Sequence, residues 1–74
     1  MKLSQLEFNK KAKILAINCD KNTKDRLYDM GVNEEENVVL IRRAPFNDPL
    51  EIKVKDFYLA LRVCDADKIF VEYL

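Results

Sequence analysis

The sequence predicts a mainly β fold, a small five-stranded barrel with one short helix after the first strand. Three observations lead there: short segments whose apolar residues alternate, one stretch with helical spacing, and a length of only 74 residues. Alternation puts apolar side chains on one face of a strand, whereas steps of three and four put them on one side of a helix. Five short strands leave exposed edges in a flat sheet, so we expect a partly open barrel within a single domain, residues 1–74.

Five segments show the pattern of strands. The clearest is Leu50–Lys55, in which Leu50, Ile52 and Val54 alternate with charged residues. In the first strand Leu15 and Ile17 fall on the face opposite Ile14, so we expect both faces to be covered. The fourth strand is predicted from its period alone, because its Leu and Ala residues also suit a helix. The expected strands are Lys11–Asn18, Asn37–Arg43, Leu50–Lys55, Tyr58–Val63 and Ile69–Tyr73.

The helical segment is Asp20–Gly31. Thr23, Leu27 and Met30 fall on one side of it, and its final glycine stands where a left-handed residue ends a helix. Val32 would then pack back onto Leu27, as in a Schellman motif.

Shorter connections complete the chain. Two leucines near the start, Leu3 and Leu6, suit one turn that covers the edge of the core. Asn33–Asn37 reads as an acidic turn, and Cys64–Lys68 as a single helical turn or loop. Ala44–Pro49 is a rigid loop, because its two prolines cannot donate to a sheet.

The composition excludes several classes of function. Thirteen Lys and Arg balance thirteen Asp and Glu, so no basic excess indicates nucleic-acid binding. Two cysteines, Cys19 and Cys64, are too few for a disulfide framework. We interpret them as free thiols in or near the core, with one disulfide as the alternative. No apolar run has the length of a membrane helix, and the first residues do not resemble a signal peptide. We therefore expect a cytoplasmic protein without membrane insertion.

No catalytic, cofactor-binding or closed metal-binding constellation is present in the sequence. There is no histidine, one glycine, and no pair of cysteines at metal-ligand spacing. The acidic run Glu34–Glu36 could attract a hard cation such as Fe²⁺ weakly, but a solvated turn is the simpler interpretation. We therefore predict no enzyme, no cofactor and no resident metal.

The proline loop is the candidate contact surface. Of the pair Arg42 and Arg43 at least one must point outward, either to form an ion pair with Glu51 or Asp48 or to meet an acidic partner. Phe46 lies between the two prolines. It either folds back under the loop, which is the commoner arrangement, or is displayed to a partner.

These segments together resemble the FeoA family, small SH3-like barrels of bacterial ferrous-iron transport. The stretch 42–54 (RRAPFNDPLEIKV) is similar to the family's RRAP, small turn, DP and alternating strand. The segments 59–62 (LALR), 65–71 (DADKIFV) and 26–32 (RLYDMGV) match other parts of the family pattern in the same order, and the opening around Leu3, Leu6 and Lys11 also fits.

The resemblance implies an accessory or regulatory adaptor that acts through protein contact. Its implied partner is the cytoplasmic GTP-binding part of a membrane ferrous-iron transporter, to which the adaptor would be recruited at the inner face of the membrane. The candidate partner-binding residues are Arg26, Tyr28, Arg43, Pro45, Phe46, Asn47 and Pro49. The alternatives are a small Fe²⁺-responsive sensor and a regulatory SH3-like domain related to those of metal-dependent repressors.

Departures from the family pattern concern turns. Four positions where the family would have a turn glycine hold Asn9, Glu35, Asn47 and Asp56. Asn and Asp tolerate a left-handed backbone better than other non-glycine residues, so Glu35 is the unusual substitution.

Overall fold

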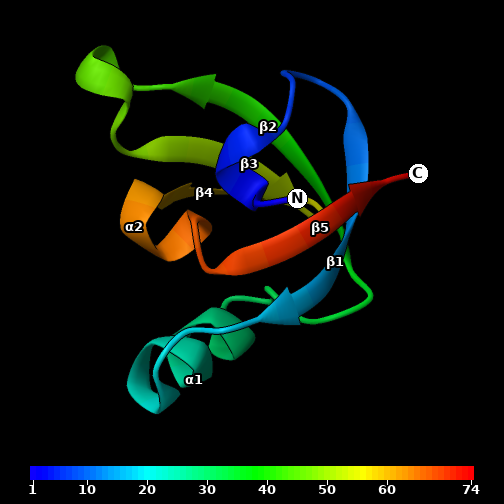
Figure 1. The fold of residues 1–74 in the computed structure, drawn as a ribbon, viewed down its shortest axis with the longest axis vertical. Helices are drawn as coiled ribbons and strands as arrows, with labels where there is room; N and C mark the ends of the chain where they lie inside the picture. Colours follow the sequence, from blue (N-terminus) through cyan, green and yellow to red (C-terminus); the bar gives the residue numbers. More distant parts are fainter.

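The computed structural model describes residues 1–74 and shows one antiparallel sheet that curls strongly around a small core (Figure 1). The strands follow the order β4-β3-β2-β1-β5, so β4 and β5 form the two edges. The strands are β1 (Lys11–Ile17), β2 (Asn37–Arg43), β3 (Leu50–Val54), β4 (Phe57–Leu61) and β5 (Ile69–Tyr73). The helices are α1 (Lys21–Asp29) and α2 (Val63–Ala66), with 3₁₀ turns at Leu3–Gln5 and Pro45–Asn47. None of these helices has both the length and the apolar character needed to cross a bilayer.

The five predicted strands and the helix after the first strand are confirmed. The second and fifth strands have the predicted bounds, the first and third end one residue earlier than predicted, and the fourth differs at both ends. It begins at Phe57, and Val63 is the first residue of α2 instead of a strand residue. The Arg62 carbonyl accepts hydrogen bonds from Asp65 N–H (3.0 Å) and Ala66 N–H (2.9 Å), which starts the helix there. Alternation alone could not separate Val63 from the strand, because an apolar residue at this position continues the pattern of Leu59 and Leu61.

The core consists of sixteen buried residues, all of them apolar. Every inward position of β3 belongs to it, which confirms the predicted alternation of Leu50, Ile52 and Val54. Leu3 and Leu6 are also buried, so the first turn does cover the edge of the core. With no buried polar or charged residue, the interior is held by apolar burial and by the hydrogen bonds of the sheet.

The first strand contains an irregularity that the sequence pattern did not reveal. Ile14 pairs with Val71 and Ala16 pairs with Phe70, so Leu15 is one extra residue in β1, a β-bulge. The bulge turns Ile17 to the same side as Ile14, where both are buried, and leaves Leu15 exposed. The expectation that Leu15 and Ile17 share a covered second face was therefore wrong.

The end of α1 has the predicted Schellman geometry. Gly31 has a φ of +88°, and its N–H donates to the Tyr28 carbonyl at 3.0 Å. The Val32 N–H donates to the Leu27 carbonyl at 2.8 Å, and both of these apolar side chains are buried. Met30, predicted to lie on the same side of the helix as Leu27, is the C-cap residue of α1 and is 43% exposed.

Three of the four substituted turn positions have left-handed backbones: Asn9 (φ 64°), Glu35 (φ 73°) and Asn47 (φ 65°). Asp56 does not, because its neighbour Lys55 (φ 55°) takes the left-handed conformation in the turn between β3 and β4. Glu35 thus adopts a conformation that favours glycine.

Candidate partner-binding surfaces

The proline loop joins β2 to β3 and projects from one end of the molecule (Figure 1, green loop beside β2). Two backbone hydrogen bonds close it: Ala44 N–H donates to the Pro49 carbonyl at 2.9 Å, and Asn47 N–H donates to the Ala44 carbonyl at 2.8 Å. Phe46 and Asn47 are consecutive residues with left-handed backbones, at φ 66° and 65°. The loop therefore has one defined shape with Phe46 at its tip.

Phe46 is fully exposed, with a relative accessible area of 100% for the residue. This exposure shows that the arrangement in which Phe46 folds back under the loop is wrong. The residue also has a left-handed backbone. A left-handed conformation costs a non-glycine residue about 1–2 kcal/mol. No buried contact of the Phe46 ring offsets that cost within this chain.

A hollow of 510 Å³ lies beside the loop. It is lined by Phe8, Asn9, Ile41, Arg42, Arg43 and Asn47. Phe8 is half-exposed, so a second aromatic ring flanks the hollow. We call Phe8, Arg43, Pro45, Phe46, Asn47 and Pro49 the proline-loop surface. Five of the seven predicted contact residues belong to it.

The two arginines beside the loop have different roles. Arg42 points outward and pairs with Glu51, with 3.1 Å between Nε and Oε1. This ion pair was one of the predicted alternatives. The Arg43 guanidinium instead donates a hydrogen bond to the Ser4 carbonyl, and Arg43 is half-buried. Arg43 therefore ties the first turn of the chain to the base of the loop, and Arg42 is the more accessible cation.

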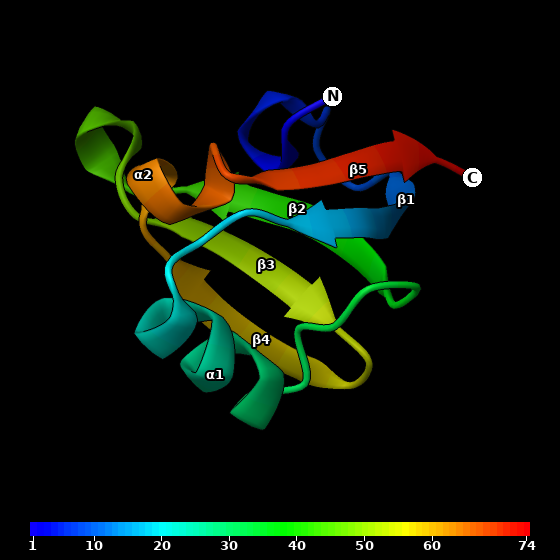
Figure 2. The same ribbon diagram turned by 60° about the horizontal axis from the view of Figure 1, so that its bottom comes forward.

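The other two predicted contact residues, Arg26 and Tyr28, are not beside the proline loop. They lie on α1, which is at the opposite end of the molecule in both views (Figures 1 and 2). The seven predicted residues thus form two separate surfaces. Sequence reasoning grouped them because it had no information on where α1 lies relative to the loop.

Arg26 and Tyr28 line a groove between α1 and β4. It consists of two hollows that share Met30, one of 510 Å³ at the end of β4 near Phe57 and one of 260 Å³ near Ala60. We call this the α1–β4 groove, lined by Arg26, Leu27, Tyr28, Met30, Phe57, Tyr58, Leu59, Ala60 and Arg62.

Three exposed apolar side chains in this groove were missed by the sequence analysis: Met30, Phe57 and Tyr58. Phe57 has the inward parity of Leu59 and Leu61, yet it is 59% exposed; it is the first residue of the edge strand β4, directly after the turn. The available signal was the aromatic pair directly after the Lys55-Asp56 turn.

Tyr28 is fixed in its position by a carboxylate. Its hydroxyl donates a hydrogen bond to Glu34 Oε2 at 3.0 Å. Partial burial of the ring raises the pKa of Tyr28 above its usual value, and the Glu34 carboxylate raises it further because it would repel a phenolate. The hydroxyl therefore stays protonated and acts as a hydrogen-bond donor at neutral pH.

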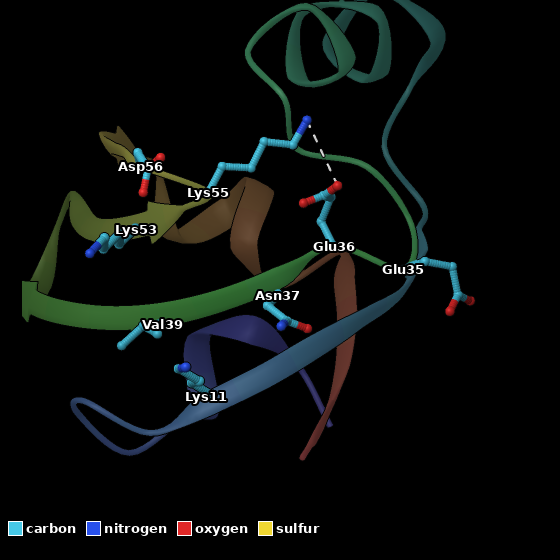
Figure 3. Close-up of a pocket in the computed structure, with 8 residues that line it drawn as sticks. All are labelled: Lys11, Glu35, Glu36, Asn37, Val39, Lys53, Lys55 and Asp56. Atoms are coloured by element: carbon cyan, nitrogen blue, oxygen red, sulfur yellow. Dashed lines mark ion pairs between the residues drawn. The ribbon is translucent and has the colours of Figure 1, made fainter.

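The three glutamates of the acidic run point to three different partners. Glu34 accepts from Tyr28, Glu35 pairs with Lys13 at 3.4 Å, and Glu36 pairs with Lys55 at 3.7 Å. Glu35 and Glu36 border a polar hollow of 450 Å³. In the close-up of its lining residues, Glu36 is directed at Lys55 and Glu35 is directed away (Figure 3). Each carboxylate is thus balanced by its own donor or cation.

The two cysteines differ in their surroundings. Both are free thiols; Cys19 is half-buried against the core, and Cys64 is exposed on α2. The predicted near-core position is confirmed for Cys19 and wrong for Cys64. Burial raises the pKa of the Cys19 thiol, and the nearby Asp65 carboxylate adds to the rise.

Comparison with known proteins gives consistent results for sequence and fold. The FeoA domain family matches residues 1–73. The Fe(2+) transport protein A/Fe(2+) transporter FeoB fusion protein of Porphyromonas gingivalis (strain ATCC BAA-308 / W83) is 30% identical over 74 residues, which are 100% of this chain and 9% of the fusion protein.

Solved structures of FeoA proteins have the same fold as this chain. The FeoA protein from Chlorobium tepidum is 30% identical, with a TM-score of 0.95 over 100% of this chain and 70% of that chain. The zinc-complexed FeoA of Stenotrophomonas maltophilia, described as a prokaryotic SH3 domain protein, is 25% identical, with a TM-score of 0.83 over 97% of this chain and 89% of that one. The SH3-like fold predicted from the sequence is thereby confirmed. On the family match and these likenesses, the chain belongs to the FeoA family.

Proposed function

We propose that this protein is a non-catalytic adaptor of ferrous-iron uptake that binds the cytoplasmic GTP-binding part of a membrane ferrous-iron transporter. The observation that carries this proposal is Phe46, a fully exposed ring on a closed loop with two consecutive left-handed residues. Conformations of this kind cost free energy and concentrate at functional sites. A partner that covers the ring would recover part of that cost.

The fusion in Porphyromonas gingivalis supports the choice of partner. There, a segment similar to this whole chain is joined to an Fe(2+) transporter in one polypeptide. Joining two domains raises their effective concentration around each other, which is useful when the domains work in contact. A separate chain of the same family would have to reach the transporter by binding, at the cytoplasmic side of the membrane.

The surroundings of Phe46 fit a protein contact better than a chemical step. Phe8 offers a second aromatic ring. Arg42, which lines the hollow beside this surface, offers an outward cation that is paired with Glu51. Aromatic residues and arginine are enriched where protein interfaces concentrate their binding energy. The proline-loop surface would therefore bind an apolar site bordered by acidic residues on the transporter.

The test is a binding measurement between this protein and the purified cytoplasmic GTP-binding part of the transporter. Burial of one phenylalanine side chain contributes about 1.5–3 kcal/mol, so Phe46→Ala is expected to raise Kd by about 10- to 100-fold. Leu15→Ala is the matched control, because Leu15 is also an exposed apolar residue but lies on β1, outside both surfaces. Circular dichroism should show that both variants stay folded.

Two results would contradict the proposal. One is the absence of binding by the folded wild-type protein at tens of micromolar, on the scale of about −6 kcal/mol. The other is an equal loss of affinity in Phe46→Ala and Leu15→Ala, which would mean that the proline loop has no special part in the contact.

A further inference from the structure

The outer edge of β4 is open. β4 is the last strand of the sheet, and β3 is its sole neighbour. In an antiparallel ladder, the backbone groups of successive residues point alternately to one neighbour and to the other. The residues of β4 whose groups point away from β3 therefore have no strand to pair with.

The register identifies those residues. Asn9 N–H donates to the Leu40 carbonyl at 2.8 Å, so the backbone of Leu40 faces the β1 side of β2. Because the direction alternates, the backbone groups of Val39 point to β3, and those of its partner Lys53 point to β2. The backbone groups of Ile52 and Val54, on either side of Lys53, therefore point to β4.

Those two residues pair with Phe57 and Leu59, so Tyr58 and Ala60 direct their N–H and C=O groups outward. Neither backbone makes a hydrogen bond outside the sheet. Both residues are also exposed. The edge thus presents two donors and two acceptors in the spacing of a strand.

This edge borders the α1–β4 groove, whose apolar part lies at one end. Met30 (43%), Phe57 (59%) and Tyr58 (61%) are exposed there around a volume of 510 Å³. The open edge can therefore be extended by a strand whose apolar side chains enter the groove.

The other end of the groove is basic. Arg26 and Arg62 both line it, and neither forms an ion pair, whereas Asp65 is the one carboxylate of the same hollow. An acidic side chain placed here would therefore lie near two cations, Arg26 and Arg62, and only one carboxylate, Asp65.

We infer that β4 accepts an extended acidic-apolar segment of the protein partner as a sixth strand. An apolar side chain of this segment lies against Met30 and Phe57, and an acidic side chain lies between Arg26 and Arg62. The inference rests on the proposed function for the identity of the partner. A second copy of this chain fits less well, because it would bring a whole sheet up to α1, whose residues Arg26, Leu27 and Met30 line the other side of the groove.

Amide hydrogen exchange followed by NMR tests this directly. In the free protein, Tyr58 and Ala60 amides should exchange faster than the amides of Leu59 and Leu61, which face β3. With a saturating amount of the purified cytoplasmic GTP-binding part of the transporter, exchange at Tyr58 and Ala60 should slow by at least about tenfold, because the new strand accepts their hydrogen bonds.

Variants at Ala60 separate backbone pairing from side-chain contact. Ala60→Pro removes the outward N–H, a change that edge strands tolerate, and is expected to raise Kd by about tenfold. Ala60→Val keeps the N–H and is the matched comparison, whose Kd should rise clearly less than that of Ala60→Pro. If Ala60→Pro does not fold, Arg62→Glu replaces it, because reversal of a charge at the basic end should weaken the same contact.

The outcomes are distinct. If the partner binds while exchange at Tyr58 and Ala60 stays fast, the inferred strand is wrong and the proposed function stands. If the wild-type protein does not bind at all, both fail. If the two amides become protected without the partner, in proportion to protein concentration, the occupant is a second copy and the inference is wrong.

Discussion

Replacement of Gly31 by alanine tests whether the end of α1 depends on a left-handed residue. Gly31 has a φ of +88°, and both hydrogen bonds of the Schellman motif depend on that conformation. An added Cβ would meet only two atoms of the Lys55 side chain, each at 3.9 Å, which is ordinary contact. The cost of Gly31→Ala is therefore a backbone cost and not a clash.

Its size follows from two opposing contributions. Forcing a non-glycine residue into the left-handed region costs about 1–2 kcal/mol. Alanine also lowers the conformational entropy of the unfolded chain, which stabilises the folded state by about 0.4–1 kcal/mol. The net loss is about 1 kcal/mol, which for a domain of this size lowers Tm by about 4–8 °C.

Thermal and urea denaturation, followed by circular dichroism, give this difference. Gly31→Asn is the control, because asparagine tolerates the left-handed conformation and should lose clearly less stability than alanine. The reasoning is refuted if Gly31→Ala is as stable as the wild type. It is also refuted if alanine and asparagine cost the same, since the loss would then not come from the backbone conformation.

Three further predictions concern the core, a tyrosine and the thiols. Leu50 is fully buried, so Leu50→Ala should cost about 2–5 kcal/mol in urea denaturation, and a loss below about 1 kcal/mol would contradict the assigned core. The pKa of Tyr28 is raised, so its contribution to stability is complete below the unfolded value of 10.0 and is lost as the pH rises through the folded pKa. An NMR titration of the ring should show Glu34→Gln lowering that pKa, and an unchanged midpoint would count against the hydrogen bond. Cys64 is exposed and should react with a thiol reagent before Cys19, whose pKa is raised by burial; equal rates in mass spectrometry would contradict this.

Local patterns predicted the elements of this fold well. The bounds of β2 and β5 and the Schellman end at Gly31 follow from residues close to one another in the chain. The bulge at Leu15 was not predictable in this way, because a strand and a strand with one extra residue begin with the same alternation. Which residue of a turn takes the left-handed conformation, Lys55 or Asp56, likewise depends on how the two strands meet.

The candidate site was predictable as a set of residues but not as an arrangement. The proline loop stood out because its two prolines bracket Phe46, yet the direction of the ring depends on the backbone of the closed loop. Arg26 and Tyr28 were grouped with the loop although α1 places them in a different groove. The open edge of β4 could not be seen at all in the sequence, since it is a property of strand order.

The extra residue in β1 also has a consequence for how this chain tolerates changes in length. If Leu15 were deleted, Ala16 would follow Ile14 directly, and Ile17 would keep its place in the core through ordinary alternation. Elsewhere in a strand, the loss of one residue would turn every following side chain to the opposite face. Position 15 is thus a point inside the sheet at which a one-residue gap between relatives is compatible with an unchanged interior.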